Sequence, residues 1–232
     1  VQSYLAGIEW IAAASRAVNL FERPGISVKL SALHARYSIT QADRVMAELL
    51  PRLKAILCAG RTANIAVSLD AEEANRLELE LAIYQNLLED PEFADFAGIG
   101  FVLQAYQKRA VYVAEALGAL ATKLNRRIPV RLVKGAYWDS EIKHAQVMGL
   151  PGYPVFTRKE YTDVSYLACA EILLGHATHI YPQFATHNAL TVASIITMAE
   201  QHGVAPDGFE FQRLHGMGET LHDQLVLLKG AS

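Results

Sequence analysis

Cysteine is scarce in this sequence, with two residues in a chain of 232. Cys58 and Cys169 both stand in apolar, helix-like surroundings, Ile-Leu-Cys-Ala and Leu-Ala-Cys-Ala. We interpret them as small core residues, because this pair forms neither a disulfide framework nor a metal-ligand cluster. Such cysteine usage is typical of a reducing compartment such as the cytoplasm.

Long apolar runs and runs of basic residues are also missing. No segment reaches the length of a membrane span, and the first residues lack the charged start and cleavage site of a signal peptide. The net charge of -3 provides no excess of positive charge that would attract a nucleic-acid partner. The sequence therefore predicts a soluble cytoplasmic protein that binds no nucleic acid, with peripheral contact at the inner membrane left open.

Hydrophobic residues make up 52% of the sequence, which is enough for one large core or two small ones, and a single domain is the simpler interpretation. Segments with strand-like patterns alternate with segments of helical periodicity. The predicted strands are 26–33, 64–70, 99–106, the segment that begins at Pro129, 153–157, 180–187 and 209–215. The predicted helices are 1–20, 40–59, 72–89, 108–125, 138–148, 161–175, 188–202 and 219–229. This alternation predicts a single α/β domain over residues 1–232, with a parallel sheet.

Polar side chains recur on one face of the predicted strands or at their ends. They are Lys29, Asp70, Gln104, Arg131, Lys134, Tyr137, His187 and Gln212. This pattern favours a (β/α)8 TIM-type barrel over a doubly wound sheet, because polar residues at the carboxyl ends of barrel strands line a functional site. The acidic residues of segment 72–89 are interpreted instead as the solvated face of an amphipathic helix.

The segment 131–138 has the pattern of a buried strand, yet it carries two cations, Arg131 and Lys134, and ends in Tyr137 and Trp138. Charges inside an apolar segment are costly unless they meet a ligand or an opposite charge. The segment therefore predicts either a binding site or ion pairs with carboxylates of neighbouring strands.

Two other patterns in the sequence are interpreted as structural and not as metal-binding or phosphate-binding sites. His176 and His179 have weak metal-ligand spacing without a clear third ligand, so we interpret them as loop residues and predict no metal site. Gly216 and Gly218 follow a predicted strand and are interpreted as a turn rather than as a phosphate-binding loop.

The most specific signal is a set of seven separated blocks. They are 26–34 (ISVKLSALH), 69–73 (LDAEE), 103–109 (LQAYQKR), 131–138 (RLVKGAYW), 156–159 (FTRK), 181–188 (YPQFATHN) and 211–219 (FQRLHGMGE). In the same order along the chain, these blocks resemble the proline dehydrogenase domain of the bifunctional bacterial proline utilization flavoenzyme.

The resemblance implies a distorted (β/α)8 barrel that binds FAD, oxidises L-proline to Δ1-pyrroline-5-carboxylate and passes the electrons to a quinone. It implies that the cofactor is bound by Gln104, Arg131, Gly135, Trp138, Thr157, Lys159, Thr186, His187 and Gln212, with Arg131 near the flavin ring. It implies four candidate catalytic residues around the proline pocket, namely Lys29, Asp70, Tyr137 and Leu214. An aldehyde dehydrogenase domain fused in the parent protein is a further expected partner.

The sequence departs from the family pattern at its end. The residues after His215 suffice for one helix, but not for the eighth strand and eighth helix of the family. Those elements carry the arginine pair that grips the substrate carboxylate, and Arg126 and Arg127 precede the fourth strand, on the wrong rim for this task. We therefore expect an incomplete barrel that is a fragment of a longer protein.

Two alternatives to proline oxidation are left open. The chain could be a truncated flavin-binding barrel without catalytic activity, or a Schiff-base lyase of the aldolase type that uses Lys29 or Lys134 as the amine. Lys29 could serve as an ion-pair partner of Asp70, as a substrate contact, or as both. Asp70 is interpreted as the partner of a cation rather than as a general base.

Overall fold

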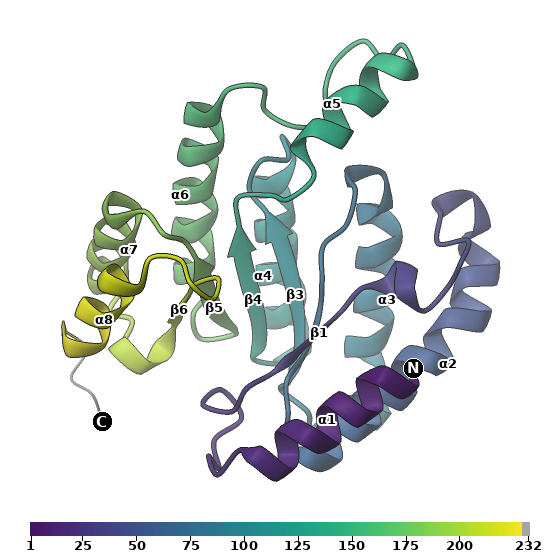
Figure 1. Cartoon of the computed structure of the whole chain (residues 1–232), viewed down its shortest axis with the longest axis horizontal. Helices are drawn as coiled ribbons and strands as arrows, with labels where there is room; N and C mark the ends of the chain where they lie inside the picture. Colours follow the sequence, from purple (N-terminus) through teal and green to yellow (C-terminus); the bar gives the residue numbers. More distant parts are fainter. Residues whose placement is uncertain (229–232) are drawn as a thin grey trace. The chain divides into compact units, whose positions relative to one another are not determined.

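The computed structural model describes residues 1–228, which divide into two compact units, residues 1–102 and the residues from Leu103 onward. Figure 1 follows the elements of each unit along the chain. None of the helices within residues 1–228 is both long and apolar enough to cross a bilayer.

The first unit contains parallel strands that are connected by helices. Its elements are α1 (Gln2–Ala14), β1 (Ile26–Val28), α2 (Ala42–Ala63), β2 (Val67–Leu69), α3 (Leu77–Glu89) and the start of β3 (Ile99–Gln104). The strands are parallel neighbours, with Val67 opposite both Ile26 and Ile99. The helix α2 buries an apolar face with helical spacing and ends at Asn64, whose φ of 53° is tolerated by asparagine at a helix C-terminus.

The second unit repeats this alternation. Its elements after β3 are α4 (Ala110–Leu124), β4 (Ile128–Val133), α5 (Trp138–Val147), α6 (Lys159–Gly175), β5 (Ile180–Ala185), α7 (Ala189–Gln201), β6 (Glu210–Gln212) and α8 (Glu219–Leu228). The helix α6 packs against α4, β4 and β5 (Figure 1). The Tyr166 hydroxyl of α6 donates to the carbonyl oxygens of Leu132 at 3.2 Å and Ala185 at 3.1 Å, so the buried side of the helix is tied to both strands.

The strands are parallel and adjacent in chain order, β1-β2-β3 in the first unit and β4-β5-β6 in the second. A doubly wound sheet reverses its strand order at one point, and neither unit contains a reversal. The predicted α/β class with parallel strands is therefore confirmed, and the strand order is that of part of a TIM-type barrel. Closure into eight strands stays a prediction.

Several predictions about single segments are wrong. The predicted helix 1–20 ends at Ala14, and the segment 131–138, predicted as a buried strand, is a strand only as far as Val133, because α5 begins at Trp138. The candidate strand 153–157 is not part of the parallel sheet, because Val155 forms only an isolated antiparallel bridge with Gln107. The predicted strand 26–33 ends at Val28, since the chain turns at once into a short 3-10 helix, Leu30–Ala32. The predicted helix 72–89 begins only at Leu77 as an α-helix, and the end of the predicted helix 219–229 lies outside the described residues.

The acidic residues of segment 72–89 do not all face solvent. Glu72 and Glu80 are buried, because the helical repeat places Glu80 on the same face as Leu77, Ile83 and Tyr84. The carboxyl oxygen Oε1 of Glu80 has no hydrogen-bond partner within residues 1–228. Burial, and next the charges of Glu72 and Asp70, hold the pKa of Glu80 well above its ordinary value.

We predict that Glu80→Gln stabilises the protein at neutral pH. In the unfolded chain Glu80 ionises above about pH 4, whereas the raised pKa makes the folded protein keep the proton to higher pH. The folded state is therefore disfavoured progressively as the pH rises from the unfolded pKa toward the raised folded pKa, and glutamine removes this cost. Each kcal/mol gained raises the Tm by about 2–4 °C for a chain of this size.

Thermal unfolding of the two proteins between acidic and neutral pH checks this expectation. The difference in Tm should grow with pH, and it should be larger than the difference caused by Glu78→Gln, which removes a carboxyl group from the exposed side of the same helix. A Tm difference between Glu80→Gln and the unsubstituted protein that does not depend on pH would contradict a buried, protonated Glu80.

Candidate functional site

A cavity of about 330 Å³ opens at the carboxyl end of β4. It is lined by Tyr106, Lys134, Gly135, Trp138, Phe156, Thr157, Arg158, Lys159 and Thr162. These residues come from the turn after β3, the β4–α5 connection and the first turn of α6 with the segment that precedes it. The cavity thus brings together four of the residues predicted to bind the cofactor, Gly135, Trp138, Thr157 and Lys159.

One wall of the cavity depends on a close approach between Gly135 and the ring of Tyr106. The φ of Gly135 is +138°, and a Cβ atom at this position would lie 2.4 Å from Tyr106 Cγ. The backbone holds the two residues together, since the Tyr106 amide donates to the Lys134 carbonyl at 2.7 Å. The Phe156 amide donates to the Tyr106 carbonyl at 2.8 Å, which adds the segment before α6 to the same wall.

Trp138 is fixed on the rim of the cavity by its indole group. Its Nε1 donates to the Phe156 carbonyl at 2.9 Å, while the side chain as a whole stays exposed. Tryptophan combines a large flat apolar surface with one donor, so this hydrogen bond orients a surface that suits a planar ligand.

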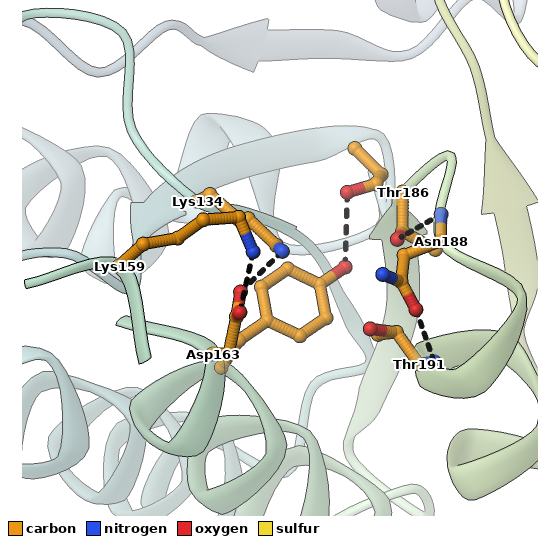
Figure 2. A network of polar contacts seen from close by, with 8 residues as sticks. Lys134, Lys159, Asp163, Thr186, Asn188 and Thr191 are labelled. Carbon is orange, nitrogen blue, oxygen red and sulfur yellow. Dashed lines mark hydrogen bonds and ion pairs between the residues drawn. The ribbon is translucent and has the colours of Figure 1, made fainter. Parts of the chain in front are cut away.

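The charged groups of the cavity centre on Asp163, a residue that sequence reasoning did not select. Its carboxylate forms ion pairs with Lys134 and Lys159, and Lys159 Nζ lies 2.5 Å from Asp163 Oδ2 (Figure 2). Burial opposes ionisation of Asp163, but the two lysines outweigh it and hold the pKa of this carboxyl below its ordinary value. The hydrogen bond to Asp163 raises the pKa of Lys159. With Arg158 included, the positive charges at this site outnumber the carboxylate, which favours an anionic ligand.

The ion pair of Lys134 supports the alternative that the sequence left open for this residue. Lys134 meets a carboxylate, although Asp163 lies on a helix and not on a neighbouring strand. The spacing of Lys159 and Asp163, four residues apart, is the one signal in the sequence that could have revealed this carboxylate.

Gln104 and Arg131 lie on the strands next to the cavity. Gln104 is buried at the end of β3, where its Oε1 accepts a hydrogen bond from the Ala136 amide at 3.2 Å and supports the turn around Gly135. Arg131 is half-buried on β4 and stands opposite Gln183 of β5. Neither residue lines the cavity itself, and neither does the half-buried Tyr137.

A second group of predicted residues gathers at the ends of β5 and β6. His187 Nε2 accepts a hydrogen bond from the Leu214 amide at 3.0 Å, and the Thr186 amide donates to the Gln212 carbonyl at 3.1 Å. His222 of α8 donates from Nε2 to the Thr186 carbonyl at 3.0 Å. No motif marks His222 in the sequence, because its partner Thr186 lies 36 positions earlier.

The same end of the sheet is fixed by the carboxylate of Glu210. It accepts hydrogen bonds from the Gln212 side chain and from Gln183 Nε2, the latter at 3.0 Å. Asn188 begins α7, where its side chain accepts from the Thr191 amide at 3.0 Å (Figure 2). These bonds order the backbone on both sides of His187.

The first unit holds the remaining predicted residues, Lys29 and Asp70, at the ends of β1 and β2. Lys29 Nζ lies 4.0 Å from Asp70 Oδ2, with side chains 51% and 31% exposed. The ion pair predicted for these residues is present, and their contact with substrate stays a prediction. Glu72 supports this region, since its Oε1 accepts from the Ser31 amide at 2.8 Å.

Comparison with known proteins identifies the family. Residues 1–231 match the family described as proline dehydrogenase. The chain belongs to the proline dehydrogenase family. It is 57% identical over 224 residues to the bifunctional protein PutA of Klebsiella aerogenes, an alignment that covers 97% of this chain and 17% of that protein. It is 31% identical to proline dehydrogenase 1 of Bacillus subtilis, over 76% of this chain and 51% of the relative.

A solved structure agrees with this assignment. The crystal structure of a mutant of proline utilization A from Bradyrhizobium japonicum matches with a TM-score of 0.92 and 52% identity, over 97% of this chain and 23% of that chain. The proline dehydrogenase resemblance of the seven sequence blocks is thus confirmed. The chain spans about a fifth of the length of these two bifunctional relatives.

We predict that Gly135→Ala destabilises the protein by about 2 kcal/mol and distorts the cavity, because both the positive φ and the contact with the Tyr106 ring exclude a Cβ atom. Chemical unfolding monitored by circular dichroism measures the effect. The matched control is Gly152→Ala, where no atom lies within 4 Å of the added Cβ. Equal stability of the two variants would contradict the close approach at Gly135.

Proposed function

We propose that this proline dehydrogenase family chain binds FAD and oxidises L-proline to Δ1-pyrroline-5-carboxylate, with a quinone as electron acceptor. The observation that carries the proposal is the basic cavity with aromatic walls at the end of β4, where four of the residues matched to the cofactor lie on one surface. The family match supports the identity of the substrate.

The residues of the cavity fit a part of a flavin dinucleotide. Its volume of about 330 Å³ lies in the range of small-molecule sites. Lys159 and the Thr157 hydroxyl suit phosphate oxygens, and the side-chain-free Gly135 lets a ligand approach the backbone. Trp138 offers a flat surface with a fixed orientation. These residues would hold FAD here, together with Gln104 and with Arg131, which the family resemblance assigns to the flavin ring.

The remaining residues matched to the cofactor are Thr186, His187 and Gln212. They belong to a hydrogen-bonded group at the ends of β5 and β6, and their backbone and side chains are fixed by Leu214, His222 and Glu210. Such fixed polar groups bind a cofactor with little loss of conformational freedom. We assign them to other parts of the same FAD molecule.

The proposed reaction converts one ring C–N bond of L-proline into a C=N bond. The carbon of this bond is the one that does not carry the carboxylate. One carbon-bound hydrogen leaves with two electrons, and one nitrogen-bound hydrogen leaves as a proton. FAD supplies the two-electron acceptor for this step when bound. The positive charge of Arg131 suits the electron-rich side of such a ring, because charge that develops during the reaction is stabilised by an opposite charge held nearby.

The Lys29–Asp70 pair matches the two charges of an amino acid. The Lys29 ammonium suits the substrate carboxylate, and the Asp70 carboxylate suits the substrate ammonium. Both side chains are partly exposed, so a ligand can reach them. Tyr137 and Leu214 are further candidates for contact with proline, assigned by the family resemblance.

The proposed quinone acceptor bears on where the protein lies in the cell. Quinones dissolve in the bilayer, so an enzyme that reduces one must reach the membrane surface. We propose a cytoplasmic protein with peripheral contact at the inner membrane. The much greater length of the bifunctional relatives supports the further proposal of a fused aldehyde dehydrogenase domain in the parent.

The structure does not favour the Schiff-base lyase. A lysine must lose its proton to attack a carbonyl group, whereas the ammonium of Lys134 is engaged by Asp163. Lys29 also has a carboxylate nearby, at 4.0 Å in Asp70. Both lysines thus occupy sites that suit a charged ammonium.

We predict that the purified protein becomes yellow on incubation with FAD and that anaerobic L-proline bleaches the flavin absorbance. L-Alanine, which has no ring nitrogen, is the control and should leave the absorbance unchanged. A folded protein that stays colourless after removal of unbound FAD would contradict cofactor binding. Turnover of L-proline with an artificial electron acceptor separates an enzyme from a flavin-binding barrel without activity.

A further inference from the structure

Two lysines of the cavity share one carboxylate. Lys134 follows β4, Lys159 begins α6, and Asp163 lies one helical turn after Lys159, so that its two oxygens face the two ammonium groups (Figure 2). All three belong to the second unit, and both lysines line the cavity. The carboxylate therefore balances one of the positive charges that would otherwise face an anionic ligand.

The two ion pairs differ in exposure. The Lys134 side chain is 30% exposed and Asp163 is 36% exposed, whereas Lys159 is 71% exposed. The pair of Lys159 with Asp163 joins residues four apart on a helix surface, and exposed pairs of this kind are weak. Breaking the pair of Lys134 with Asp163 costs more free energy than breaking the pair of Lys159, because the less exposed Lys134 ammonium regains less hydration. Lys159 is consequently the side chain that can exchange its ion pair with Asp163 for a contact with a ligand.

We propose that Asp163 is a positioning residue that holds Lys159 in the unliganded protein and releases it to a phosphate group of the flavin nucleotide on binding. This inference rests on the proposed binding of FAD. Asp163 competes with the phosphate for the same ammonium group and also repels the phosphate charge. It keeps Lys134 paired in both states, so that only one cation has to move.

The test is Asp163→Asn, which keeps the size of the side chain and removes its charge. The dissociation constant of FAD is measured by quenching of flavin fluorescence in the purified, FAD-free protein. We expect FAD to bind about three- to tenfold more tightly, because Lys159 is released and the repulsion is removed. The gain should shrink at high ionic strength, since the charges are partly exposed. Riboflavin, which has no phosphate, should bind equally well to both proteins.

Two controls separate this role from a general effect of charge or structure. Glu160→Gln removes the same charge from the same turn of α6, where Glu160 is exposed and forms no ion pair with either lysine within the described residues. Its effect on FAD should be clearly smaller. In a Lys159→Gln background the gain from Asp163→Asn should become clearly smaller, because only the removed repulsion remains and the exchanged cation is missing. Asp163→Glu should restore the original affinity.

If Asp163→Asn does not fold because Lys134 is left without its partner, the same comparison is made between Lys134→Met and the double variant Lys134→Met/Asp163→Asn. An unchanged or weaker FAD affinity, or an equal change for riboflavin, overturns the inference and leaves FAD binding intact. Absence of FAD binding by the unsubstituted, folded protein overturns the proposed function and this inference together.

Discussion

The carboxyl ends of β3 and β4 are tied by two short backbone hydrogen bonds, from Ala105 to Val133 at 2.8 Å and from Tyr106 to Lys134 at 2.7 Å. They bring the Tyr106 ring against Gly135, where only a residue without a side chain fits. The Tyr106 carbonyl in turn accepts from Phe156, and the Phe156 carbonyl accepts from Trp138. Each wall of the cavity thus depends on the previous contact. The series begins with two backbone hydrogen bonds, which do not depend on particular side chains, and with a position that only glycine fits.

This framework explains why charged side chains occur in a segment that is otherwise apolar. Arg131 and Lys134 leave β4 near its end, where the sheet stops and solvent begins, and both are half-buried rather than enclosed. Lys134 meets the carboxylate of α6, which covers the same strand. The cost of placing these cations is therefore reduced by partial hydration and by an ion pair, and the excess positive charge at the cavity remains available for an anion.

The sequence predicted the features that follow from local pattern. The alternation of strands and helices, the polar ends of the strands and the grouping of Gly135, Trp138, Thr157 and Lys159 were within reach of periodicity and family resemblance. The candidate strand 153–157 was wrong because it contains Pro154, which disfavours pairing within a sheet, and its Val155 pairs only with Gln107 in the turn after β3. The prediction that Glu80 faces solvent was also wrong. A charged residue was assumed to face water, although the helical repeat turns this side chain inward.

Both residues that sequence reasoning missed contact a partner far along the chain, and Asp163 also pairs with Lys159 four positions earlier. Asp163 acts on Lys134, 29 positions earlier, and His222 acts on the Thr186 carbonyl, 36 positions earlier. His222 does not differ locally from an ordinary helix histidine, and the spacing of Asp163 from Lys159 is the one local signal for this carboxylate. The residues matched to the cofactor all lie at Gln104 or beyond, within the second unit, whereas Lys29 and Asp70 belong to the first. Of the four candidate proline contacts, Lys29 and Asp70 thus lie in the first unit, and Tyr137 and Leu214 lie in the second with every residue matched to the cofactor. Neither unit alone therefore contains all of the candidate residues.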